Sequence, residues 1–171
     1  MNPYLDKTSA LIEQAAAGLS AEQLVWRPAQ DKWSSAEIFE HLSLSFAGTN
    51  KGFARALVSG SPATRGCTMK DRIVIKVVVE LGYMPGGRKS PEAVLPRGTA
   101  PAEVMAAIRE NLAHMQKNLT AAKEKFGAKA RVLEHPVLGP LTNEQWEKFH
   151  FVHTRHHMKQ VWARRKLMGP R

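Results

Sequence analysis

Residues 146–160 read WEKFHFVHTRHHMKQ, and this stretch decides the fold that we expect for the chain. Four of the seven histidines fall within eight residues here, and no proline or glycine interrupts the run. A helix advances about 100° per residue, so His153 and His157 lie roughly 40° apart on one face. Histidines at this spacing can offer two imidazoles to one metal ion. Because two ligands rarely complete a site, a third ligand is expected from elsewhere in the chain.

Helical patterns also cover most of the remaining sequence. Two capping boxes predict helix starts, one formed by Ser34 with Glu37 and one by Thr142 with Gln145. Residues 72–81 are rich in β-branched side chains, but their apolar positions follow helical spacing, so we interpret them as a short helix. Four long helices are expected over about residues 2–18, 34–57, 99–126 and 143–167.

These elements predict an all-α fold, a four-helix bundle that forms a single domain over residues 1–171. The extra short helix and a long irregular loop, residues 82–99, lie between the second and third long helices. A loop of this length is more often functional or mobile than idle, so it is a candidate wall or lid of a pocket. Residues 133–140 are interpreted as a linker.

The composition limits the kind of protein and its partners. The formal charge is +10, with Lys and Arg scattered along the chain, which favours a solvated basic surface over a nucleic-acid groove. The single cysteine, Cys67, excludes an intramolecular disulfide and a multi-cysteine zinc site. No apolar run approaches the length of a membrane span, and the first residues do not resemble a signal peptide. We therefore expect a cytoplasmic protein with no membrane partner.

His41 is the candidate third ligand, because helices two and four of a bundle can face each other. Three neutral imidazoles leave a coordination position open, as in catalytic zinc sites. The other ring nitrogens would need acceptors, and Glu37 or Gln160 could serve. The alternatives are that His41 is a hydrogen-bonded core residue and that Glu37 only caps its helix. The two further histidines of the run are expected to support the site rather than to bind metal: His150 and His156.

Two segments resemble the DinB-like superfamily. Residues 33–42, WSSAEIFEHL, and residues 153–160, HTRHHMKQ, match its pattern of one histidine on the second helix and a distant His-x-x-x-His followed by glutamine. Residues 135–142, HPVLGPLT, resemble one uncharacterised branch of that superfamily. The resemblance implies a four-helix bundle and a metal triad formed by three residues: His41, His153 and His157.

The resemblance also implies a range of activities. Characterised relatives include metal-dependent transferases of thiols such as bacillithiol and mycothiol, a thiol-dependent isomerase and metal-dependent hydrolases, and several are homodimers. We therefore expect a metal-dependent enzyme that uses Zn²⁺ or Ni²⁺ to activate water or a low-molecular-weight thiol toward a small-molecule substrate. No catalytic residue beyond the triad is assigned. The alternative is a non-catalytic basic binding module, for instance for nucleic acid, whose histidines are only packed.

Overall fold

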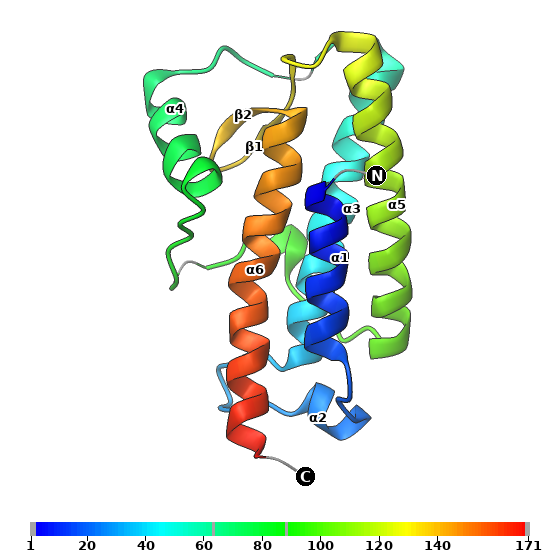
Figure 1. Cartoon of the computed structure of the whole chain (residues 1–171), viewed down its shortest axis with the longest axis vertical. Coiled ribbons are helices and arrows are strands. Elements are labelled where there is room, and N and C mark those ends of the chain that lie inside the picture. Colours follow the sequence, from blue (N-terminus) through cyan, green and yellow to red (C-terminus); the bar gives the residue numbers. More distant parts are fainter. Residues whose placement is uncertain (1–2, 63, 88, 170–171) are drawn as a thin grey trace.

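Four long helices dominate the computed structural model, which describes residues 3–62, 64–87 and 89–169. Helix α3 packs along α5, and α1 packs along α6. The expected all-α four-helix bundle is confirmed (Figure 1). The long helices are α1 (Pro3–Ala16), α3 (Ser35–Ser59), α5 (Pro101–Phe126) and α6 (Asn143–Met168).

Several short helices connect the long ones. The helix expected between the second and third long helices is confirmed, although it begins before residue 72 and its second half widens into a π-helical turn. Figure 1 shows this part of the chain projecting to one side of the bundle. The short elements are α2 (Ala21–Val25), α4 (Met69–Ile75), the π-helical turn η1 (Lys76–Glu80) and the 3₁₀-helical turn η2 (Glu92–Val94).

Local side-chain hydrogen bonds set where α3 and α6 begin. Ser34 accepts from the Glu37 amide while the Glu37 carboxylate accepts from the Ser34 amide, and Thr142 with Gln145 does the same at α6. Both predicted capping boxes are therefore confirmed. Helix α3 ends at Gly60, whose φ of +74° is accessible to glycine at little cost.

A β-hairpin replaces the linker expected at residues 133–140, so that interpretation was wrong. Strands β1 (Arg131–His135) and β2 (Gly139–Thr142) pair antiparallel. The indole nitrogen of Trp146 donates to the Leu133 carbonyl oxygen over 3.2 Å. On the other side, a Cβ at Gly52 would come within 2.6 Å of the Leu133 side chain, so the glycine lets β1 approach α3 closely. Tertiary contacts therefore place a strand where local composition indicated a linker.

The hydrophobic core lies between the long helices and positions the histidines. Phe39, Phe46 and Phe53 recur every seven residues on α3, and all three are buried. They pack in one apolar core with side chains of α5 such as Met115 and of α6 such as Met158. No described helix is both long and apolar enough to cross a membrane.

Candidate metal centre

Helices α3 and α6 bring three histidines together. His41 Nε2 lies 3.2 Å from His153 Nε2, which lies 3.0 Å from His157 Nε2. His41 and His157 are buried, whereas His153 keeps a partly exposed surface. One nitrogen from each ring lies within 4.8 Å of the others, and we call this group the histidine cluster. The structure thus joins the i,i+4 pair of α6 to a residue more than a hundred positions upstream.

The backbone of the long loop fixes the His41 ring. His41 Nδ1 lies 2.9 Å from the Val94 carbonyl oxygen, which can only accept, so Nδ1 carries the proton. His41 Nε2 therefore presents a lone pair to the other two rings. Because Val94 belongs to η2, this part of the expected long loop lies beside the histidine cluster.

The His157 ring is oriented from its own helix. Its Nδ1 lies 3.1 Å from Gln160 Oε1, and the Gln160 amide nitrogen lies 3.3 Å from His156 Nε2. With the amide oxygen accepting, His157 Nδ1 is the protonated nitrogen and Nε2 again presents a lone pair. The expected role of Gln160 as an acceptor matches this geometry.

Glu37 caps its helix, as the alternative interpretation held, and of the two suggested acceptors only Gln160 is hydrogen-bonded to a histidine of the cluster. Its carboxylate pairs with the Arg27 guanidinium and accepts from the Ser34 amide over 2.8 Å. The capping box and this ion pair use both carboxylate oxygens, and Val94 supplies the acceptor that His41 needs.

The His153 ring completes the cluster, and its surroundings indicate whether a metal ion fits there. It stacks on Phe149 with ring centroids 5.5 Å apart, and its buried Nδ1 has no hydrogen-bond partner among the described residues. The Nε2 lone pairs of His41 and His157 both point at Nε2 of His153. A single N–H at that nitrogen cannot donate a good hydrogen bond to both. Tetrahedral zinc with Zn–N bonds of about 2.0–2.1 Å places ligand nitrogens about 3.3 Å apart. Two of the three spacings, 3.0 and 3.2 Å, suit such a cation, and the remaining pair, His41 and His157, lies within 4.8 Å.

Burial keeps the three imidazoles neutral, which is the protonation state that metal binding requires. Desolvation lowers the pKa of His41, against the opposing hydrogen bond to Val94. Desolvation and the neighbouring imidazoles lower the pKa of His157 to about 3 and hold that of His153 well below its usual range. At neutral pH the cluster therefore offers uncharged nitrogen ligands.

The other histidines lie outside the cluster. His150 is fully buried in the core, where its Nε2 lies 3.1 Å from the Thr49 hydroxyl. His156 contacts Gln160 and the Met84 backbone, and His114 is exposed on α5. The expectation that His150 and His156 flank the site rather than join it agrees with these positions.

Glu40 also has a role at the site that the sequence analysis missed. Its buried carboxylate accepts from the amides of Gly98 and Thr99 over 3.0 and 3.3 Å and from the Thr99 hydroxyl over 2.6 Å. These bonds fasten the end of the 82–99 loop to α3, beside His41. The available signal was a glutamate directly before a candidate ligand in the sequence.

The fold and the site together define a class of protein: four-helix bundles with a histidine cluster between the second and fourth long helices. The DinB superfamily signature matches residues 4–161. The chain therefore belongs to the DinB superfamily.

Comparison with known proteins adds one structural relative. YfiT from Bacillus subtilis, described as a probable metal-dependent hydrolase with an unusual four-helix bundle topology, is similar with a TM-score of 0.60. The match covers 97% of this chain and 84% of YfiT at 18% sequence identity, which shows a shared fold. No curated protein sequence matches significantly.

Proposed function

We propose that the protein is a metal-dependent enzyme in which His41, His153 and His157 hold a divalent metal ion, Zn²⁺ or Ni²⁺. The convergence of their three Nε2 atoms, with two of the rings oriented by acceptors on Nδ1, carries this proposal. Membership of the DinB superfamily and the description of YfiT as metal-dependent support it. Three imidazoles suit zinc, nickel, copper and iron, so the choice of metal rests on the resemblance alone.

The chain's own groups prepare the proposed site. The Val94 carbonyl and the Gln160 amide oxygen hold the protons of His41 and His157 on Nδ1, which keeps each Nε2 free to bind. The apolar surroundings and Phe149 exclude water from the buried side of the cluster. Three protein ligands leave an open position, where a bound divalent metal would lower the pKa of a water or thiol and polarise a substrate.

The reaction class follows from what occupies that open position. Water as nucleophile makes the enzyme a hydrolase, and a low-molecular-weight thiol makes it a thiol transferase. A small-molecule substrate, which the resemblance implies, fits both reactions. Two incubations of metal-loaded protein distinguish the two reactions. Turnover of an activated ester indicates a hydrolase, and joining of a thiol to an electrophile indicates a thiol transferase.

Metal analysis of untagged protein purified without chelators tests the site itself. We expect about one metal ion per chain in the wild type, and loss of most of it in His157→Ala because only two ligands remain. His114→Ala is the matched control, since it removes an exposed imidazole from another helix. Wild-type protein without stoichiometric metal, or equal loss in both variants, would contradict the proposal.

A further inference from the structure

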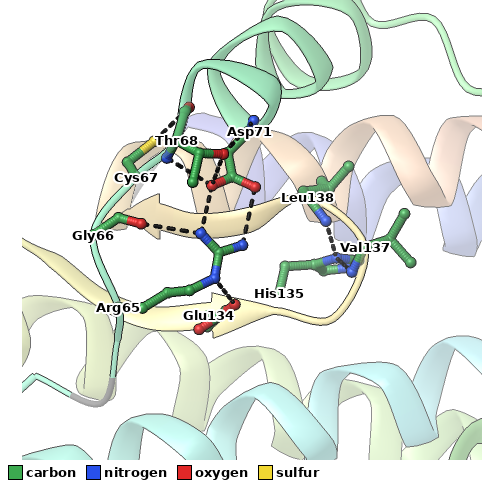
Figure 2. Close-up of polar contacts among 9 residues, drawn as sticks. All are labelled: Arg65, Gly66, Cys67, Thr68, Asp71, Glu134, His135, Val137 and Leu138. Atoms are coloured by element: carbon green, nitrogen blue, oxygen red, sulfur yellow. Dashed lines mark hydrogen bonds and ion pairs between the residues drawn. The ribbon is translucent and has the colours of Figure 1, made fainter.

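The helical segment formed by α4 and η1 lies outside the four-helix bundle (Figure 1). One of its faces is buried and the opposite face is exposed. Asp71, Ile75 and Val79 point inward and are buried. Figure 2 shows Arg65 bridging the Asp71 carboxylate, at 2.6 and 3.0 Å, and Glu134 of β1, at 2.9 Å. These contacts fix which side of the segment faces solvent.

The outward face carries an apolar stripe, which consists of Met69, Ile73, Val77 and Leu81. Their exposed fractions are 70%, 60%, 36% and 69%. At about 100° per residue, Met69, Ile73 and Val77 fall within roughly 80° of the helix circumference. Contiguous exposed apolar side chains of this kind usually mark an interaction surface.

Basic residues border the stripe. Lys70, Arg72 and Lys76 are exposed and take part in no ion pair formed within the described part of the chain. The two carboxylates of the segment are already paired, Asp71 with Arg65 and Glu80 with Lys148. The outward face is therefore apolar and positive, which calls for a partner that is apolar and negative.

We propose that α4 and η1 form a docking surface for an anionic membrane, with the apolar stripe in the interface and the basic border at the lipid phosphates. Helices with an apolar face beside Lys and Arg lie in the plane of such interfaces without spanning them. This proposal departs from the expectation of no membrane partner, which rested on the lack of a spanning run, the lack of a signal peptide and the scattered basic residues.

A protein partner fits the observations less well. Stable protein interfaces use roughly 20–30 residues on each side, far more than the stripe and its border offer. A second copy of the chain would bring a second set of the same basic residues, Lys70, Arg72 and Lys76, to one small interface, and the added positive charge would oppose association. A lipid surface needs neither a matching shape nor an acidic sequence.

The segment leads directly to the proposed metal site. The Gly82 carbonyl oxygen accepts from Arg155 of α6 over 2.9 Å, and the Met84 backbone is hydrogen-bonded to the His156 ring. Docking of α4 and η1 would therefore bring the chain that follows them, including the contacts of Gly82 and Met84 with α6, close to the lipid surface. The membrane proposal does not depend on a bound metal, so membrane binding and metal binding can be tested separately.

Vesicle co-sedimentation tests the proposal with untagged full-length protein. We expect binding to vesicles that contain phosphatidylglycerol and little binding to phosphatidylcholine alone. Ile73→Glu should weaken binding at least about tenfold, because it places a carboxylate in the centre of the stripe. Val58→Glu is the matched control, since it makes the same charge change at an apolar residue of α3 that is 89% exposed. Circular dichroism and metal content should match the wild type in both variants.

Three results would overturn the proposal. One is no binding to phosphatidylglycerol vesicles, and another is equal weakening by Ile73→Glu and Val58→Glu, which would show attraction by net charge alone. The third is a wild-type dimer, detected by light scattering, that Ile73→Glu converts to a monomer, since the stripe would then be an interface between copies.

Discussion

His153 lies at the centre of the histidine cluster, and it has the weakest protein support of the three candidate ligands. His41 and His157 each have an acceptor for Nδ1, but the buried Nδ1 of His153 has none among the described residues. Its orientation instead depends on stacking against Phe149 and on the two neighbouring rings. A cation held by all three Nε2 atoms would replace the crowded lone pairs with favourable bonds.

Gln160 is expected to set the metal affinity through His157. Gln160→Leu removes the acceptor for His157 Nδ1 and should weaken metal binding about 10–100-fold without unfolding the protein. Competition with a chromophoric chelator measures this. Gln14→Leu, at an exposed position of α1, should leave the affinity unchanged. Equal affinities for Gln160→Leu and the wild type would contradict the role assigned to Gln160.

At the scale of elements, the 82–99 loop is attached to α3 at two neighbouring residues. Val94 contacts His41, and Gly98 with Thr99 contacts Glu40. A loop without regular ladder hydrogen bonds is thus fixed by side chains of a rigid helix. The order of this part of the loop and the orientation of His41 therefore depend on the same helical turn.

Glu40→Gln is expected to loosen this loop. The amide has one acceptor oxygen instead of two, so one of the three bonds from Gly98 and Thr99 is lost or weakened. Hydrogen exchange measured by mass spectrometry should increase about tenfold in peptides that cover residues 95–99. Glu124→Gln, an exposed carboxylate on α5, provides the control. Unchanged exchange in these peptides would show that Glu40 does not fasten the loop.

At the scale of the whole molecule, buried neutral histidines couple stability to pH. Desolvation lowers the pKa of His135 from the ordinary 6.5 to about 4, and that of buried His150 to about 3. As the pH falls below 6.5, these histidines become protonated in the unfolded chain but stay neutral in the folded chain. The free energy of unfolding therefore decreases. The stability contributed by these groups is present above pH 6.5 and is lost toward pH 4 and below.

Urea unfolding of metal-free protein tests this coupling. For His135 alone, the free energy of unfolding should fall by about 1–2 kcal/mol between pH 7 and pH 5. In His135→Asn the pH dependence should be shallower by that amount, because asparagine can still accept from the amides of Val137 and Leu138. His114→Asn removes an exposed histidine and should keep the wild-type dependence. An unchanged slope in His135→Asn would refute the assignment.

Interactions within a few residues of the chain made much of the fold predictable. Capping boxes such as those at Ser34 and Thr142 depend on side chains three positions apart, and the pairing of His153 with His157 depends on the helical repeat. The sequence by itself therefore determined the long helices and two members of the histidine cluster. The expected facing of the second and fourth long helices made His41 the candidate third ligand. The resemblance supported this choice, because its motif records an arrangement that spacing alone cannot show.

Only the tertiary structure decided the contacts between distant segments. Leu133 lies in a strand because Trp146 binds its carbonyl and Gly52 leaves it room, and neither contact is visible in the local sequence. Val94 rather than Glu37 orients His41, because an irregular loop has no periodicity from which its path can be inferred. The apolar stripe on α4 and η1 likewise depends on tertiary structure, because the packing of the inward face against the protein decides which residues remain exposed. Helix formation is local, whereas the choice of neighbours depends on packing across the whole chain.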